Sequence, residues 1–170
     1  MTLHVIISIV ALAVVLLMML GELMRSRHNE GVLRRRGAVE PTGDVYRTLA
    51  WAYPGMFVAM AIEGVISPPS PGLIMLAGAV VFSAAKLLKF WAIAALGIRW
   101  TYRVLVPPDA PLIASGPYVW LRHPNYVSVF GEIAGMALIV GSPVTGAISL
   151  IAFGVLVRRR IAVEDRALGK

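Results

Sequence analysis

The chain has 170 residues, of which 58% are hydrophobic and only 15% are charged, and its mean hydropathy is +0.78. This composition lies outside the range of soluble globular domains and indicates an integral membrane protein. The formal net charge of +7 comes from basic residues in short runs beside apolar segments, which argues against a nucleic-acid partner. The chain has no cysteine, and its three histidines are too widely spaced to predict a metal site.

Five apolar segments approach the roughly 20 residues with which a helix crosses a bilayer. They cover residues 3–24, 45–66, 73–97, 125–140 and 144–157. We therefore predict an all-α integral membrane protein with about five transmembrane helices, forming a single domain over residues 1–170. The last two segments are short and are joined only by residues 141–143, which predicts a tight helical hairpin. The first segment is long enough for a full crossing, and we interpret it as a retained span and not as a cleaved signal.

The distribution of Lys and Arg predicts how these helices are oriented. Basic residues gather after the first, third and fifth segments, whereas the turns at 67–71 and 141–143 carry no charge. By the positive-inside rule, the N-terminus is expected outside. The loop at 98–124 and the tail at 158–170 are expected in the cytoplasm.

One polar stretch interrupts the apolar C-terminal half. Residues 114–126 read A-S-G-P-Y-V-W-L-R-H-P-N-Y, and both Gly-Pro and His-Pro break helices. The stretch is therefore predicted to be a shaped loop, which at a membrane boundary is a usual place for ligand binding or chemistry. Taken alone, His123 fits a hydrogen-bonded loop residue equally well. Trp91, Trp100 and Trp120 likewise fit an aromatic belt at the interface.

The basic tail contains a second candidate pair. If the fifth helix continues into the tail, Arg160 and Glu164 lie one turn apart on the same face. They can then pair with each other beside the membrane, or hold one ligand together. The predicted orientation places this pair on the same side of the membrane as the 114–126 loop.

Ionisable residues inside the apolar segments are the third candidate feature, because a charge near the bilayer centre costs about 2.5 to 3.5 kcal/mol on insertion scales. Lys86 and Glu132 fall near the middle of their segments, and Lys89 shares a helical face with Lys86. We expect these residues and Glu63 to pair within the bundle or to reach an interface. Glu132 is also a candidate to line a substrate channel.

Three motifs together resemble the isoprenylcysteine carboxyl methyltransferase family and, more distantly, the phospholipid methyltransferases. They read L-G-I-R-W-T at 96–101, L-I-A-S-G-P-Y-V-W-L-R-H-P-N-Y at 112–126 and R-I-A-V-E-D-R-A-L at 160–168. The motif at 112–126 is similar to the family pattern of G-P-Y followed by R-H-P-x-Y, and the motif at 160–168 is similar to R-I-x-x-E-[ED]-x-x-L. The N-terminal half resembles the bacterial branch through E-L-M-R-S-R-H-N-E at 22–30 and G-A-V-E at 37–40. Pro111 departs from a histidine that some members have.

The resemblance implies transfer of a methyl group from S-adenosylmethionine to an oxygen of a lipophilic acceptor. The acceptor would enter from the bilayer of a bacterial cytoplasmic membrane, and the cofactor would bind without a Rossmann domain. Membrane lipids are the other expected partners, and no metal is implied. By resemblance, the cofactor-binding residues are Gly116, Tyr118, Arg122, His123, Pro124, Tyr126 and Glu164. Arg160 and Glu164 are the implied catalytic residues, and Trp100 and Glu132 are weaker candidates to contact the acceptor.

The resemblance leaves the acceptor open between two classes. Prenylcysteine carboxylates are already ionised, so Arg160 could hold one by paired hydrogen bonds. The other class is phenolic or enolic hydroxyls, such as those of the alkyl-resorcinols and alkyl-pyrones with which some bacterial relatives are associated. A phenol has a pKa near 10. Such an acceptor therefore needs a base, such as Glu164 or His123.

Other functions also remain open at this point. They are a phospholipid N-methyltransferase, a relative that binds the cofactor without turnover, and a non-catalytic transporter subunit or assembly factor. A transporter is expected to show repeated halves with broken helices in matching positions. Here the polar loop and the basic tail both lie in the C-terminal half and have no counterpart upstream.

Overall fold

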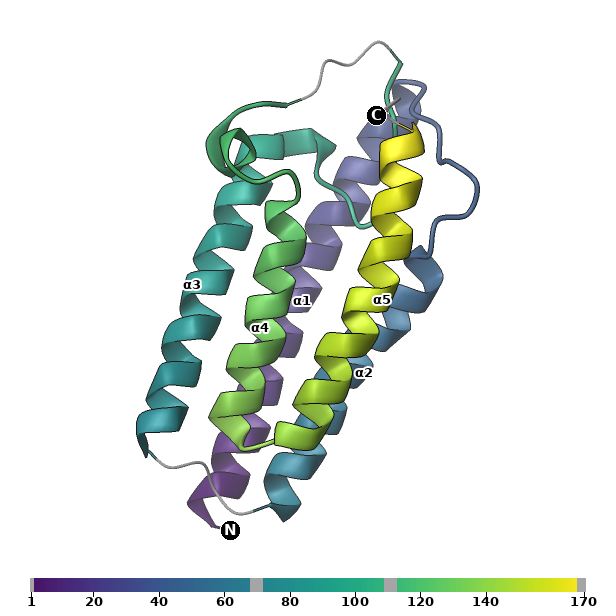
Figure 1. Ribbon diagram of the computed structural model, residues 1–170. Helices are drawn as coiled ribbons and strands as arrows, with labels where there is room; N and C mark the ends of the chain where they lie inside the picture. Colours follow the sequence, from purple (N-terminus) through teal and green to yellow (C-terminus); the bar gives the residue numbers. More distant parts are fainter. Residues whose placement is uncertain (1, 68–71, 109–112, 168–170) are drawn as a thin grey trace.

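The computed structural model describes residues 2–67, 72–108 and 113–167, and its regular structure in these ranges is almost entirely helical. Five α-helices run alongside one another as a bundle (Figure 1). They are α1 (Leu3–Arg35), α2 (Tyr46–Ile66), α3 (Gly72–Leu96), α4 (Pro124–Val140) and α5 (Pro143–Ala167). Two short 3-10 helices, η1 (Gly97–Arg99) and η2 (Gly116–Val119), lie between α3 and α4. The predicted all-α class is confirmed.

The helices differ in how well they fit a bilayer. Within the described ranges, α1, α2 and α3 are long and apolar enough to cross a membrane, and α4 is a shorter apolar helix of 17 residues. Helix α1 continues past the predicted end at residue 24, and α5 continues past residue 157. Both extensions lie at the end of the bundle that also carries the α3–α4 connection, opposite the N-terminus (Figure 1). This end therefore collects the basic residues of the chain.

The predicted tight hairpin between α4 and α5 is also confirmed. Gly141 has a φ of 73°, and the backbone N–H groups of Gly141 and Ser142 both donate to the carbonyl oxygen of Ala137. A left-handed residue of this kind is the usual way to end a helix with glycine. Glu63 of α2 accepts hydrogen bonds from the backbone N–H groups of Val144 and Thr145, at 3.1 and 2.7 Å. Glu63 thus caps α5, and no lysine of the described ranges pairs with it.

Small residues bring α3 and α4 close together. A methyl group added to Gly131 would lie 2.7 Å from Cβ of Ala85, and one added to Gly135 would lie 2.7 Å from the backbone nitrogen of Phe82. Such contacts let two helix backbones approach without an intervening side chain. Because of this approach, the lysines of α3 face Glu132 of α4 directly.

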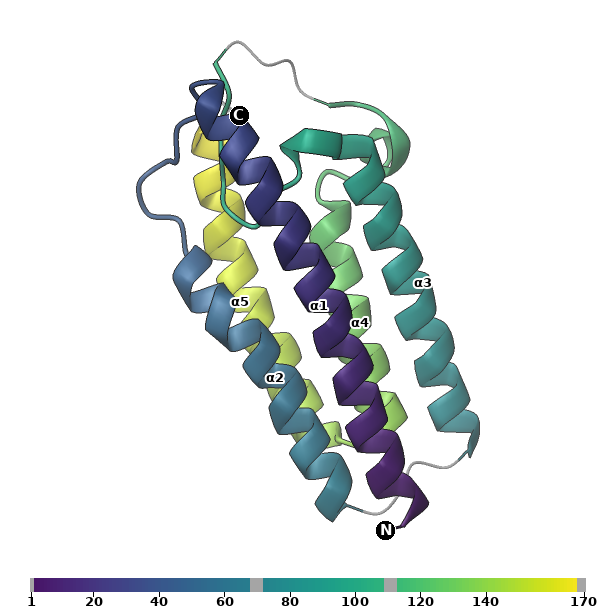
Figure 2. The same cartoon turned by 180° about the vertical axis from the view of Figure 1, so that it is seen from behind.

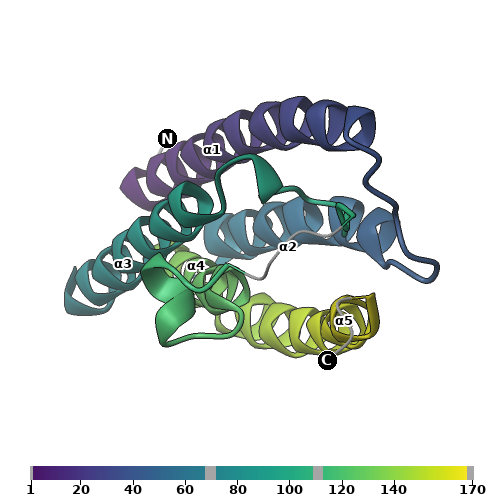
Figure 3. The same ribbon diagram turned by 90° about the horizontal axis from the view of Figure 1, so that it is seen from above.

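The apolar core lies between α2 and α4, where Phe57, Met60, Ile133 and Met136 are fully buried. From behind, α1 and α2 lie side by side, and from above, α2 lies between α1 and α5 (Figures 2 and 3). Large apolar side chains also cover the outer surface, among them Leu3, Trp51, Ile66, Leu73 and Val144. An apolar exterior around a packed core is what contact with lipid requires.

Candidate functional site

The extension of α1 supports the segment that follows α3. The Asn29 side-chain amide donates to the carbonyl oxygens of Trp100 and Gly97, at 2.7 and 3.2 Å. The Ser26 hydroxyl accepts a hydrogen bond from the backbone N–H of Tyr102 at 2.8 Å. These buried side chains fix the backbone on either side of Trp100 and so determine where Tyr102 lies.

Glycine and proline give the 114–126 loop its shape. Gly116 has a φ of +59°, and an added methyl group would lie 2.9 Å from Cβ of Ala95 and 3.2 Å from Nε1 of Trp91. Only glycine combines that backbone angle with so close an approach to α3. Pro124 occupies the first turn of α4, where its missing N–H is harmless. Gly116 and Pro124 do not line the adjoining cavity, so the structure places both as residues that shape the loop.

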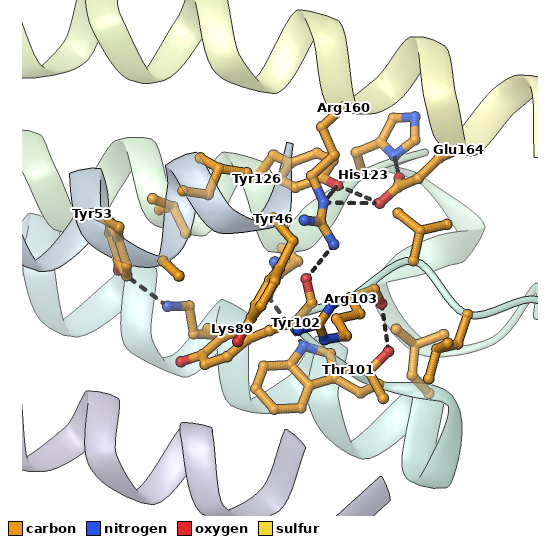
Figure 4. Close-up of a pocket in the computed structure, with 18 of the residues that line it drawn as sticks. Tyr46, Tyr53, Lys89, Thr101, Tyr102, Arg103, His123, Tyr126, Arg160 and Glu164 are labelled. Carbon is orange, nitrogen blue, oxygen red and sulfur yellow. Dashed lines mark hydrogen bonds and ion pairs between the residues drawn. The ribbon is translucent and has the colours of Figure 1, made fainter. Parts of the chain in front are cut away.

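Five side chains meet where this loop faces α5, and we call them the Arg160 cluster: Asp44, His123, Tyr126, Arg160 and Glu164. Arg160 donates from Nε to the Tyr126 hydroxyl at 2.8 Å and from Nη1 to Asp44 at 3.3 Å. Its Nη2 donates to the carbonyl oxygen of Tyr102 (Figure 4). Arg160 and Glu164 form the predicted ion pair within α5, at 3.4 Å. The Arg160 guanidinium thus contacts residues from the loop, from the tail and from the α1–α2 connection.

Glu164 holds two aromatic side chains of the motif. Its carboxylate accepts a hydrogen bond from the Tyr126 hydroxyl and lies 3.5 Å from Nδ1 of His123. The His123 and Tyr126 rings stack with their centroids 5.5 Å apart. Nε2 of His123 is buried and has no hydrogen-bond partner among the described residues. A buried nitrogen without a partner in an otherwise bonded cluster calls for one, such as an ordered water or a ligand.

The Arg160 cluster has an excess of negative charge. Asp44 and Glu164 both contact the single guanidinium of Arg160, so these three groups sum to −1 when the carboxyl groups are ionised. A cationic group of a ligand would balance the charge of these three residues, and Arg27, Arg47, Arg99, Arg103 and Arg122 also line the adjoining cavity. Two neighbouring tyrosines stay neutral: burial and the charge of Glu22 raise the pKa of Tyr102, and burial raises the pKa of Tyr118.

The remaining predicted site residues lie around this cluster. Tyr118, Arg122 and Trp100 line the same cavity as the Arg160 cluster. The Arg122 side chain is 69% exposed and pairs with Asp165 at 3.4 Å. Trp100 is buried, and its indole N–H donates to Asn125 at 3.3 Å. Pro111 and the motif residues Leu112 and Leu168 lie outside the described residues.

A second polar group lies deeper in the bundle, and we call it the buried charge cluster: Glu22, Lys86, Lys89 and Glu132. Lys86 lies 2.9 Å from Glu22 and 3.2 Å from Glu132. Lys89 lies 3.1 Å from Glu22 and 2.8 Å from Glu132. The predicted pairing of Lys86, Lys89 and Glu132 within the bundle is confirmed, with Glu22 as a partner that the sequence did not indicate. Two positive and two negative charges make the cluster neutral.

Two tyrosines connect the buried charge cluster to its surroundings. The Tyr53 hydroxyl donates to Glu132 and accepts a hydrogen bond from Lys89 at 3.3 Å. The Tyr102 hydroxyl donates to Glu22 at 3.0 Å. Because the carbonyl oxygen of Tyr102 accepts from Arg160, this one residue touches both clusters.

A cavity of about 970 Å³ adjoins both clusters. Figure 4 shows Tyr53 and Lys89 on one side and His123, Arg160 and Glu164 on the other. Between them the wall is largely apolar and comes from α1 and α2: Leu16, Met19, Leu20, Leu23, Leu49, Trp51 and Pro54. Lys86 and Glu132 are not among the residues that line the cavity. Glu132, predicted to contact the acceptor, reaches the wall only through Lys89 and Tyr53.

Sequence reasoning did not single out Asp44, Tyr53, Tyr102 or Glu22. Some signal was present, because Asp44 is an acid in the loop that follows the basic run at 34–36 and Tyr102 directly follows the motif at 96–101. Glu22 is the acid that ends the first apolar segment. Their roles depend on which helices become neighbours, and spacing along the chain does not contain that information.

The apolar helices and the cavity indicate an integral membrane protein with an internal cavity lined by polar and apolar residues. The sequence pattern of the isoprenylcysteine carboxyl methyltransferase (ICMT) family matches residues 75–170, and the chain belongs to that family. It is accordingly a membrane methyltransferase, and members of the family depend on S-adenosylmethionine. The chain is similar to the uncharacterized protein YpbQ of Bacillus subtilis, with 30% identity over 92% of this chain and 94% of that protein. It is also similar to an uncharacterized protein of Haemophilus influenzae, with 24% identity over 84% of each chain.

Proposed function

We propose that this protein transfers a methyl group from S-adenosylmethionine to an oxygen atom of a lipophilic acceptor in a bacterial cytoplasmic membrane. The N-terminus would lie outside, and the Arg160 cluster would face the cytoplasm. One observation carries the proposal: a single cavity joins the Arg160 cluster to the apolar faces of α1 and α2. A soluble, charged cofactor and a lipid-like acceptor can react only in a cavity that has both a polar and an apolar part.

The residues present fit the cofactor, which supplies an electrophilic methyl group on a sulfonium centre. The carboxylate of Glu164 lines the cavity and suits the cationic groups of the cofactor, and the arginines that line the same cavity suit its carboxylate. The rings of Tyr118 and Tyr126 are neutral faces of the kind that attract sulfonium and ammonium groups. Nε2 of His123 is available for a further hydrogen bond, since it has no partner among the described residues. His123, Tyr126 and Glu164 would hold the cofactor, with Tyr118 and Arg122 around them.

Entry of the acceptor from the bilayer is supported by the wall that α1 and α2 form. Leu20 and Trp51 line the cavity and are 52% and 83% exposed. An opening of the cavity toward the bilayer between these two helices would account for this exposure. An apolar tail could pass there without leaving the hydrocarbon.

Arg160 is suited to hold an oxygen atom of the acceptor. Each terminal guanidinium nitrogen carries two N–H groups and donates one to Asp44 or to Tyr102. One N–H on each remains, so paired hydrogen bonds to a carboxylate or to a single oxygen are possible. Three contacts to the protein fix the plane of the guanidinium, and a fixed plane aligns whatever it binds.

Glu164 is placed to accept the proton that a hydroxyl acceptor must lose. Its carboxylate contacts both Tyr126 and His123, which hold it in one orientation. A carboxylate acceptor carries no such proton and would rely on Arg160 alone. In both cases the transfer neutralises opposite charges, so alignment and the exclusion of water are the main tasks of the site.

The proposal is tested by calorimetric binding of S-adenosylhomocysteine to the detergent-purified protein. We expect saturable binding that is lost in His123→Ala and Glu164→Ala. Arg159→Ala is the matched control, because Arg159 is an exposed tail residue beside Arg160 that does not line the cavity. Melting curves establish that each variant is folded. A folded wild-type protein that binds no S-adenosylhomocysteine would overturn the proposal and favour a non-catalytic transporter subunit or assembly factor.

A further inference from the structure

The deep wall of the cavity is polar, although it lies among the apolar helices. Tyr53, Lys89 and Tyr102 line it, and none of them belongs to the Arg160 cluster. Lys89 is 1% exposed in the whole protein, so its ammonium group lies away from bulk solvent. A polar wall of this kind is unfavourable beside a uniform hydrocarbon tail, because hydrogen-bonding atoms would face a partner that cannot bond to them.

The charge balance of the wall decides what could bind to it. Glu22, Lys86, Lys89 and Glu132 sum to zero, and every charge has opposite charges within 3.2 Å. A carboxylate or a phosphate bound there would bring an uncompensated charge into a region of low dielectric. A neutral oxygen function, such as a hydroxyl or a carbonyl, would bring no charge into this region.

The hydrogen-bonding capacity of the wall also suits a neutral oxygen. The Tyr102 hydroxyl uses its hydrogen on Glu22, so its lone pairs can accept a hydrogen bond from a hydroxyl group. Lys89 donates to Tyr53 at 3.3 Å, which is longer than either of its distances to the glutamates. A carbonyl or hydroxyl oxygen could take over this weakest contact. Tyr53 would keep its hydrogen bond to Glu132.

We propose that Lys89, Tyr53 and Tyr102 form a second polar subsite, which binds a neutral oxygen function of the acceptor other than the one that is methylated. This inference rests on the proposed function. The acceptor would carry two oxygen functions on its head group, because Tyr102 contacts Arg160 with its carbonyl oxygen and Glu22 with its hydroxyl group. Lys86 and the two glutamates would act only as positioning residues for Lys89.

The test compares two probes that differ by one hydroxyl group, dodecylresorcinol and meta-dodecylphenol, in equilibrium binding to the protein in nanodiscs. We expect the wild-type protein to bind dodecylresorcinol about fivefold more tightly, the effect of one hydrogen bond made in place of water. Tyr102→Phe removes only a hydroxyl group and should bring the ratio of the two dissociation constants close to one. Lys89→Met should do the same.

Lys86→Met is the matched control for Lys89→Met. Both variants remove one positive charge from the buried charge cluster, but only Lys89 lines the cavity. The subsite predicts that Lys86→Met keeps the wild-type ratio, whereas a purely structural role predicts equal ratios in the two variants. If the lysine variants do not fold, the ratio of the two dissociation constants in Tyr102→Phe alone tests the subsite.

Binding of S-adenosylhomocysteine, measured in parallel, separates this inference from the proposed function. A wild-type probe ratio of one, together with intact S-adenosylhomocysteine binding, overturns the subsite and leaves the proposed function standing. A fivefold ratio that disappears in Tyr102→Phe supports the subsite even if S-adenosylhomocysteine does not bind. A ratio that survives in Tyr102→Phe and in Lys89→Met also overturns it.

Discussion

The two polar clusters of this bundle differ in how their buried charges are balanced. The buried charge cluster joins two lysines and two glutamates from three helices, and its charges cancel. The Arg160 cluster has two carboxylates on one guanidinium and a histidine nitrogen without a partner among the described residues. The buried charge cluster balances its own charge, whereas the Arg160 cluster keeps a net charge of −1 on Asp44, Arg160 and Glu164. The comparison separates a cluster that joins three helices from one whose charge a bound cofactor would balance under the proposed function.

The largest expected effect on the contrast between the two clusters comes from replacing Glu132. Two lysines would then share Glu22 alone in the bundle interior. Breaking a buried pair in this way costs roughly 3–5 kcal/mol, so Glu132→Ala should lose most of its folded fraction. Thermal unfolding in detergent measures this. A melting temperature unchanged from the wild type would show that the cluster contributes little to stability.

Glu164→Gln tests the Arg160 cluster as a chemical site. The amide keeps the shape of the side chain but cannot accept a proton. Methyl transfer to a phenolic or enolic hydroxyl should fall by about 10²- to 10⁴-fold, the usual contribution of a general base. Transfer to a prenylcysteine-like carboxylate should fall much less, and both rates are measurable with labelled S-adenosylmethionine. Equal losses on both acceptors would assign Glu164 to cofactor binding only.

Gly116→Ala tests the shape of the loop that supplies His123 and Tyr126. The added methyl group would meet Ala95 at 2.9 Å in a backbone conformation with φ of +59°. We expect a loss of about 1–3 kcal/mol in stability and weaker S-adenosylhomocysteine binding. Gly43→Ala provides a control for the backbone effect, because Gly43 also has positive φ but no neighbour within 4 Å. Equal behaviour of the two variants would remove the argument from close packing.

The smallest expected effect concerns a surface ion pair near the Arg160 cluster. Burial raises the pKa of Glu40, but hydrogen bonds from Arg103 and Arg34 outweigh it and lower that pKa below its usual 4.5. The lowered pKa means that this pairing stabilises the folded protein above pH 4.5, and the contribution disappears as pH falls through the pKa of folded Glu40. For a partly exposed pair it amounts to about 0.2–1 kcal/mol. Glu40→Gln should therefore lower the melting temperature slightly at pH 7, and the difference from the wild type should shrink as the pH is lowered below 4.5.

Helix number, the hairpin and the α5 extension could be predicted because each depends on local patterns. Apolar length identifies the spans, Gly141 and Pro143 mark the turn, and the spacing of Arg160 and Glu164 places both on one helical face. The motif at 114–126 likewise identified His123 and Tyr126, which the structure brings against Glu164. Local patterns of this kind can be read from the sequence without knowing which helices become neighbours.

The rest of the site depends on which helices become neighbours. Glu22 and Lys86 are 64 positions apart, and Asp44 and Arg160 are 116 apart. Their contacts follow from the packing of α1 against the other helices and from the path of the α1–α2 connection. Glu132 shows the limit clearly, because a lone acid in an apolar segment predicts either a partner or a ligand. Only the neighbouring lysines show that it has partners.

The Ser26 and Asn29 hydrogen bonds to the segment after α3 have a consequence for protein engineering. The family match begins at residue 75, so a chimaera that exchanged only residues 75–170 between two relatives would contain the motifs at 96–101, 112–126 and 160–168. It would nevertheless separate Trp100 and Tyr102 from the α1 side chains that hold their backbone. Exchanges at that boundary should yield inactive hybrids unless Ser26, Asn29 and Asp44 are transferred as well. Acceptor preference is therefore better transplanted by exchanging cavity-lining residues of α1 and α2 than by exchanging halves.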